Sequence, residues 1–190
     1  MEVVRQQIRT MTVASFRAWL KSRPDKERWE LIEGAPMMVA PPTRRHQRIV
    51  LNLANLLNEA LAAHDPTLEA IHDAGVNVVS EAPYDPEPDV VVIRESDNPD
   101  PHYAGQLYLV AEVLSDSDKD VIGRKRQLYQ AQPACSCILL VRQDRAEIAV
   151  DRRSEEGWRT EVLLAEDQLS LPAFGLRCRV RDVYRRTPLE

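Results

Sequence analysis

Hydrophobic residues recur at two different spacings along the chain, and these spacings predict a mixture of helices and strands. A long helix is predicted for residues 43–63, because its apolar positions follow the three-to-four-residue spacing of a helix: Ile49, Leu53, Leu56, Leu57 and Leu61. A first helix is predicted for residues 12–23, with the Thr12 hydroxyl as its N-cap. A further helix is predicted for residues 120–131, where a proline follows.

Short apolar runs between and after these helices predict strands. Residues 29–32 and 36–40 are two strands joined by a turn at Glu33-Gly34. Further strands are predicted for residues 68–72, 76–79, 89–94, 108–114, 138–141, 146–152 and 158–164, with a hairpin turn at 155–157. The tail, residues 169–184, adds a short strand and a terminal turn of helix. Many strands with few helices packed on them predict an α/β or α+β sandwich.

Length and composition favour one globular domain over residues 1–190, since 44% of the residues are hydrophobic and 29% are charged. No apolar run is long enough to span a membrane, and the first ten residues lack the apolar centre of a signal peptide. We therefore expect a cytoplasmic protein without a membrane partner. Cys135 and Cys137 lie in an apolar stretch and are interpreted as small core residues, because no further metal ligands lie near them in the sequence.

The net charge of −5 argues mildly against strong non-specific binding to DNA, which depends on neutralising phosphates with Lys and Arg. The distribution of the basic residues matters more than their sum. They gather at Arg44, Arg45 and Arg48, at residues 124–126, and between residues 177 and 186. Each cluster is either a contact for phosphates or a solvated face.

Two predicted strands carry a carboxylate where the pattern calls for an apolar residue. Asp89 opens the run Val90-Val91-Val92-Ile93, and Glu112 lies within residues 108–114. A strand this apolar is expected to be buried on both faces, where an unpaired carboxylate costs several kcal/mol. A bound cation would compensate for this cost; the alternatives are a buried salt bridge, or a position of Glu112 at the exposed end of its strand.

Lys125 follows Glu112 on the first turns of the next predicted helix, from which it could reach back to the sheet. Two carboxylates and a lysine around one point are typical of metal-assisted hydrolysis of phosphodiesters. Carboxylates hold Mg²⁺ or Mn²⁺, the cation activates a water molecule, and the lysine offsets negative charge. Taken alone, Lys125 could equally be a surface lysine.

The order of several short motifs resembles the Uma family of putative restriction endonucleases, a branch of the PD-(D/E)xK nuclease superfamily. The motifs are WELIEG at 29–34, Pro41-Pro42, His46-Gln47-Arg48, EPDV at 87–90, AEVLS at 111–115, and Lys125 with Leu128-Tyr129. The resemblance covers about residues 12–184. It implies a restriction-endonuclease-like core, a central mixed sheet flanked by helices, with additional antiparallel strands.

The resemblance also implies roles for individual residues. It assigns Asp89 and Glu112 as metal ligands, Glu30 as a supporting acid and Lys125 as the lysine of the motif. His46 matches a family histidine, and we interpret it as a residue that contacts phosphate or lines the site, together with Arg48 and Arg124. The simplest form of the motif places lysine two residues after the second acid, where this chain has Leu114. The loop 115–120 is about one residue short for this family, so Arg124 is an alternative to Lys125.

Three functions therefore fit the sequence. The first is an endonuclease that cuts DNA with Mg²⁺ or Mn²⁺; the second is a module that keeps this fold for binding without turnover; the third is another metal-dependent hydrolase. A homodimer is plausible, because cutting both strands of a duplex needs two sites and symmetric dimers are the commonest oligomers.

Overall fold

Six strands form the sheet at the centre of the computed structural model, which describes residues 10–97, 103–115 and 121–190. They are β3 (Glu69–His72), β5 (Val90–Ile93), β7 (Leu109–Leu114), β8 (Cys137–Arg142), β9 (Glu147–Ser154) and β10 (Gly157–Leu164). Their order in space is β10-β9-β8-β7-β5-β3. The β7–β8 pair is parallel and the other neighbours are antiparallel, so the sheet is mixed.

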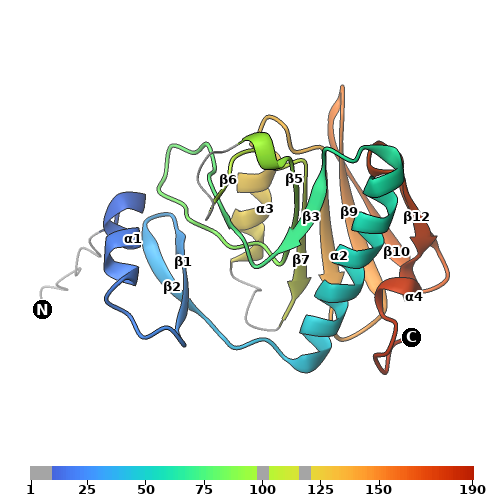
Figure 1. Ribbon diagram of the computed structural model, residues 1–190, viewed down its shortest axis with the longest axis horizontal. Helices are drawn as coiled ribbons and strands as arrows, with labels where there is room; N and C mark the ends of the chain where they lie inside the picture. The colour runs from blue at the N-terminus through green and yellow to red at the C-terminus, as the bar shows by residue number, and fades with distance from the viewer. Residues whose placement is uncertain (1–9, 98–102, 116–120) are drawn as a thin grey trace, which may run out of the picture.

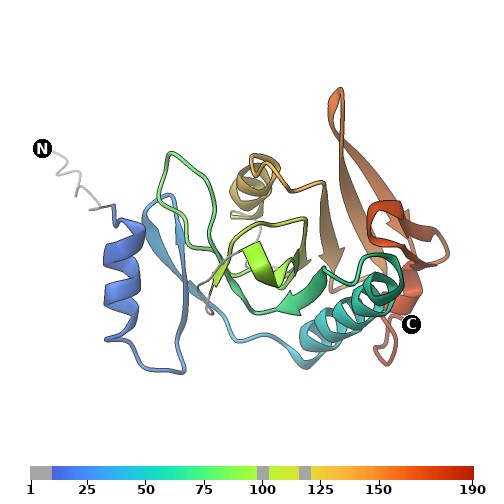
Figure 2. The ribbon, with the colours of Figure 1, turned by 45° about the horizontal axis from the view of Figure 1, so that its top comes forward.

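Two helices cover opposite faces of this sheet, as Figure 2 shows: α2 (Arg44–His64) on one face and α3 (Ile122–Gln130) on the other. Each face has its own hydrophobic core. One core joins α2 to the strands through residues such as Leu53 and Ala111, and the other joins α3 to them through residues such as Leu128 and Val110. Side chains alternate between the faces of a strand, so Glu112 shares the face of Val110 and points toward α3.

The helix α3 connects the two parallel strands β7 and β8. Parallel neighbours cannot be joined by a tight hairpin, and a helix across the sheet provides the longer connection that they need. This crossover places the first turns of α3 above the end of β7, which carries Glu112.

The N-terminal part forms a separate layer at one end of the molecule (Figure 1), with α1 (Val13–Leu20) and the hairpin of β1 (Arg28–Ile32) and β2 (Ala35–Val39). Asp85 attaches this layer to the rest. Its backbone pairs with Leu31, and its buried carboxylate accepts hydrogen bonds from Arg17. Nearby, β4 (Gly75–Val76) pairs with β6 (Tyr103–Ala104), and η1 (Glu95–Asp97) follows β5.

The C-terminal part packs against α2 through the hairpin of β11 (Gln168–Leu171) and β12 (Leu176–Arg179), with η3 (Pro172–Phe174) between them. The short α4 (Val180–Val183) follows. Tyr184 is fully buried, and its hydroxyl donates to the carbonyl oxygens of Arg142 and Glu147.

The predicted fold class is confirmed: a central mixed sheet flanked by helices, with additional antiparallel strands. The strand predicted for residues 76–79 is wrong beyond Val76, and the tail contains a two-stranded hairpin where one strand was predicted. Val76 pairs with Ala104, a partner distant in the chain that local patterns do not reveal, whereas β11 and β12 are the two short strands of one local hairpin. Cys135 and Cys137 are buried and unpaired, as predicted for core residues. No helix within the described ranges is long and apolar enough to cross a membrane.

Candidate active site

Asp89 and Glu112 meet at the end of two neighbouring antiparallel strands. Val90 of β5 pairs with Ala111 of β7, so the next positions along the ladder are Asp89 and Glu112. The regular pairing stops there, and the Val113 N–H donates instead to Asp89 Oδ2 at 2.7 Å. The predicted placement of the two acids on adjacent strands is therefore confirmed, with Asp89 immediately before its strand.

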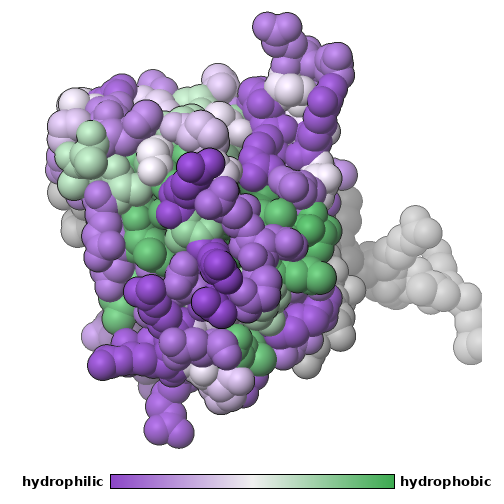
Figure 3. All heavy atoms as spheres, turned by 90° about the vertical axis from the view of Figure 1, so that its right-hand side faces the viewer, coloured by the Kyte–Doolittle hydropathy of each residue, from purple (hydrophilic) through white to green (hydrophobic). Residues whose placement is uncertain are grey.

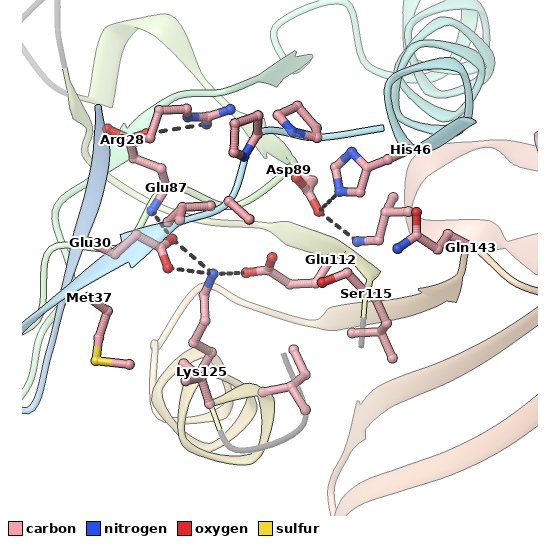
Figure 4. A pocket seen from close by; sticks show the side chains of 18 of the residues that line it. Arg28, Glu30, Met37, His46, Glu87, Asp89, Glu112, Ser115, Lys125 and Gln143 are labelled. Carbon is pink, nitrogen blue, oxygen red and sulfur yellow. Dashed lines mark hydrogen bonds and ion pairs between the residues drawn. The ribbon is translucent and has the colours of Figure 1, made fainter. Parts of the chain in front are cut away.

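Both acids line a cavity of about 460 Å³ between the hairpin, α2 and α3 (Figure 4). Glu30, His46 and Lys125 line the same cavity, although they come from three separate elements. The wall formed by β2 and the residues after it is largely apolar: Met37, Met38, Val39, Pro41 and Pro42. The cavity therefore has an acidic floor and an apolar wall.

Lys125 forms the centre of a buried cluster of charges. Its Nζ donates to Glu30 Oε1 at 2.9 Å and to Glu30 Oε2 at 3.2 Å, and it lies 2.8 Å from Glu112 Oε1. All three residues are buried. Lys125 rather than Arg124 therefore faces the acids. The charge of Glu112 is compensated within the protein by a buried salt bridge, which was one of the alternatives open from the sequence.

Tyr129 adds a second donor to Glu112. Its hydroxyl donates to Glu112 Oε1 at 2.6 Å, and the ring is fully buried against the sheet. Lys125 and Tyr129 are four residues apart on α3, so both side chains lie on the helix face that covers Glu112.

The pKa values of this cluster follow from burial and from its close charges. Burial raises the pKa of Glu112 to about 7, opposed by the Lys125 ammonium and supported by the carboxylates of Asp89 and Glu30. Burial alone would lower the pKa of Lys125, but Glu112 and Glu30 outweigh it and raise that pKa above its ordinary value. Lys125 is thus held in its charged form, and a charged ammonium cannot accept a proton from water.

His46 approaches Asp89 from the other side, with its Nε2 at 3.2 Å from Asp89 Oδ2. The sequence around it explains this position. Thr43 caps α2 by accepting a hydrogen bond from the His46 backbone N–H at 3.1 Å, which fixes the first turn of the helix at the cavity. His46 therefore lies beside the metal-ligand candidates, consistent with the site-lining position expected from the sequence.

Glu87 and Arg28 extend the charged network along the cavity wall. The Glu87 backbone N–H donates to Glu30 Oε1 at 2.8 Å, and the Glu87 carboxylate lies 3.4 Å from Arg28 Nη2. Burial raises the pKa of Glu87 despite this guanidinium. Glu30 is thereby held between a backbone donor and the Lys125 ammonium.

Two predicted substrate-binding residues lie away from the acids. Arg124 pairs with Glu33 at 3.1 Å and lines a separate shallow depression with Tyr84. Arg48 lies further along α2 and is not among the described residues that line the acidic cavity. The structure does not bring these two arginines into the site, and their contact with substrate stays a prediction.

The basic residues near the C-terminus mostly meet acidic partners. Arg179 and Arg181 contact Glu166, and Arg185 contacts Asp182. Figure 3 shows this end of the molecule, where hydrophilic side chains predominate. Of the two interpretations of this cluster, the ion pairs favour a solvated face.

Tyr129 and Arg28 contact the charged cluster, although neither is a site residue predicted from the sequence. The sequence contains one signal for each of them, which is its spacing from a predicted site residue on the same element. Tyr129 is four positions after Lys125 on a helix, and Arg28 is two positions before Glu30 on a strand, so each falls on the same face as its neighbour in the site.

The donor set suits a hard cation only in part. Among the described residues, no group of three or more His, Cys, Asp or Glu side chains is arranged to hold a metal ion. Asp89 and Glu112 nevertheless offer two carboxylates at one point of an open cavity. Mg²⁺ is commonly held by one or two carboxylates, with water and substrate phosphate completing its shell, so these residues fit such an ion.

The fold is an α/β fold whose central mixed sheet is flanked by helices, with a buried acid–lysine cluster at the end of β7. One solved structure with this fold is described as a putative nuclease belonging to DUF820 from Anabaena variabilis, with a TM-score of 0.73 and 18% identity. The match covers 92% of this chain and 97% of that one. No curated protein matches. The model of the Uma2 family, described as putative restriction endonuclease, matches residues 13–181, and the chain belongs to this family.

Proposed function

We propose that this protein is a metal-dependent endonuclease of the PD-(D/E)xK type that hydrolyses phosphodiester bonds in DNA. The observation that carries the proposal is the convergence of Asp89, Glu112 and Lys125 on one cavity from two neighbouring strands and the helix that follows them. Membership of a family described as putative restriction endonuclease supports the choice of nucleic acid as substrate.

Asp89 and Glu112 would hold Mg²⁺ or Mn²⁺ in this proposal. Such an ion, when bound, stabilises charge on the phosphate and lowers the pKa of a coordinated water. Hydrolysis forms a bond between the water oxygen and phosphorus and breaks the bond to the leaving sugar oxygen, which takes up a proton. Lys125 supplies fixed positive charge 2.8 Å from Glu112, and Glu30 keeps that ammonium in place.

His46, Arg48 and Arg124 would contact the substrate. His46 lines the cavity, which supports this role for it. The two arginines are further away, where they could reach phosphates on either side of the scissile bond, because a nucleic-acid backbone extends well beyond one cavity.

Incubation of supercoiled plasmid DNA with the purified protein and Mg²⁺ or Mn²⁺ tests the proposal. We expect nicked and linear products that are lost with EDTA and with Asp89→Ala. Asp89→Asn is a second control, since it keeps the shape of the side chain and removes only its charge. Intact plasmid with the wild-type protein under all conditions would contradict an active nuclease.

A binding module without turnover is the second candidate, and one observation favours it. The three cationic or potentially cationic side chains that line the described part of the cavity, Arg28, His46 and Lys125, each lie beside a carboxylate. Retained DNA binding without cleavage, measured by gel shift, would identify this function.

We also propose that the protein acts as a homodimer when it cuts duplex DNA, because each strand then meets its own site. Analytical ultracentrifugation measures this directly. Linear plasmid formed without a nicked intermediate is expected from a dimer, whereas a monomer would accumulate nicked circles first.

A further inference from the structure

Each of the two candidate metal ligands has one carboxylate oxygen held by the protein. Glu112 Oε1 accepts from the Tyr129 hydroxyl at 2.6 Å and lies 2.8 Å from Lys125 Nζ. Asp89 Oδ2 accepts from the Val113 N–H at 2.7 Å and lies 3.2 Å from His46 Nε2. Within the described ranges, no hydrogen bond reaches Glu112 Oε2 or Asp89 Oδ1.

Asp89 and Glu112 are therefore held in the same way, each by hydrogen bonds to one of its two carboxylate oxygens. Donors occupy the oxygen that faces the protein, and the other oxygen is left for a ligand in the cavity, into which both side chains point (Figure 4). A carboxylate with no such donors rotates freely, because its terminal torsion has broad and roughly two-fold preferences. The donors select one orientation of each acid.

We propose that Tyr129 is a positioning residue of the metal site, which holds Glu112 so that Oε2 faces the cation. This inference rests on the proposed metal-dependent function and adds a residue to it. Lys125 alone would not fix Glu112, because the same ammonium is also bound by both oxygens of Glu30. The Tyr129 hydroxyl has Glu112 as its acceptor and lies on a fully buried ring, so its direction is set by packing.

The burial of Tyr129 also keeps its hydroxyl a donor. Burial raises the pKa of Tyr129 well above its ordinary value, and the carboxylates of Glu112, Glu30 and Asp89 raise it further. The hydroxyl is therefore a donor to Glu112, as its distance of 2.6 Å from Oε1 also indicates. Hydrogen-bond partners of this kind orient metal ligands in other sites, and their loss weakens metal binding by roughly 10- to 100-fold.

Calorimetric titration with Mn²⁺ in the absence of DNA tests the inference without relying on turnover. Tyr129→Phe keeps the ring and removes only the hydroxyl. The matched control is Tyr184→Phe, because Tyr184 is also fully buried but donates to the carbonyls of Arg142 and Glu147. We expect roughly 10- to 100-fold weaker Mn²⁺ binding for Tyr129→Phe and wild-type affinity for Tyr184→Phe.

A double-mutant cycle measured by urea unfolding in EDTA checks that the hydroxyl acts on Glu112. If Tyr129 donates to the Glu112 carboxylate, then Tyr129→Phe lowers the free energy of unfolding of the wild type by more than it lowers that of Glu112→Ala, which has no carboxylate to accept the hydrogen bond. Equal losses in both backgrounds would overturn the inference, because the hydroxyl would then act through the fold and not through Glu112.

The outcomes distinguish this inference from the proposed function. Wild-type protein that binds no Mn²⁺ overturns both. Wild-type protein and Tyr129→Phe that bind Mn²⁺ equally well overturn only the role of Tyr129. If Tyr129→Phe and Tyr184→Phe weaken binding to the same degree, the effect is one of stability, and the inference is again wrong.

Discussion

Lys125 Nζ donates to Glu30 Oε1 at 2.9 Å across 95 positions of sequence, and the pair joins α3 to the N-terminal hairpin. Both side chains are more than nine-tenths buried. Breaking a buried ion pair by removing one partner leaves an uncompensated charge, which typically costs about 3–5 kcal/mol. The pair is therefore structural as well as a part of the candidate site.

This relationship predicts the effect of removing Lys125. Lys125→Met is expected to lower the free energy of unfolding by about 3–5 kcal/mol, because Glu30 and Glu112 would then lie buried without a cation. Adding Glu30→Gln to Lys125→Met is expected to recover part of this loss, since it removes one of the two carboxylates. Urea unfolding of the three proteins measures both effects. No recovery in the double variant would contradict the assignment of the loss to uncompensated charge.

Loss of either acid is expected to abolish metal binding without unfolding the protein. Asp89→Ala and Glu112→Ala each remove one of the two carboxylates that would hold the ion, and the single carboxylate that is left leaves the rest of the shell of the ion to water. Either substitution also removes the repulsion between the two carboxylates. For Asp89→Ala, the melting temperature without metal is therefore expected to stay the same or to rise. Titration with Mn²⁺ and thermal melting in EDTA check these points. Unchanged affinity in either variant would place the metal elsewhere.

The raised pKa of Glu112 predicts how stability depends on pH without metal. The folded protein holds this proton up to pH of about 7, and the unfolded chain holds it up to about 4.5. Folding therefore takes up a proton between these values, so the contribution of Glu112 is fully present below about pH 4.5 and is lost as the pH rises to about 7. The expected difference is on the order of 3 kcal/mol.

Glu112→Gln is the reference for this measurement, because it cannot titrate. The wild-type free energy of unfolding is expected to fall relative to that of Glu112→Gln as the pH rises through this range. Urea unfolding in EDTA at several pH values gives both curves. Parallel curves would show that Glu112 titrates in the folded protein as it does in the unfolded chain.

Arg48 and Arg124 allow a test of where DNA extends beyond the cavity. If each contacts a phosphate, Arg48→Ala and Arg124→Ala should each weaken DNA binding and reduce its salt slope by roughly one unit. Arg159→Ala is the control, since Arg159 is an exposed arginine on β10, distant in the sheet from the acids. Fluorescence anisotropy at a series of salt concentrations checks this. Salt slopes equal to that of the control would exclude both residues from the interface.

The sequence predicts those residues of the candidate site that depart from the hydrophobic pattern of their own helix or strand. Asp89 and Glu112 were visible because carboxylates interrupted apolar strands, and Lys125 because it opened the next helix. Tyr129 and Arg28 broke no pattern. An aromatic residue on the apolar face of a helix and an arginine at the start of a strand are both ordinary, so their partners had to be seen in space.

The sequence by itself determined the mixed α/β class and most element boundaries, because these depend on periodicity and on caps such as Thr12 and Thr43 within a few residues. The tertiary structure decided which side chain compensates the negative charge of Glu112. The apolar pattern around Glu112 predicts that this carboxylate is buried and needs a compensating positive charge. Whether Lys125 or Arg124 supplies that charge depends on which side of α3 faces the sheet. Adjacent helix positions point in directions about 100° apart, so a shift of one residue in the preceding loop would exchange the two.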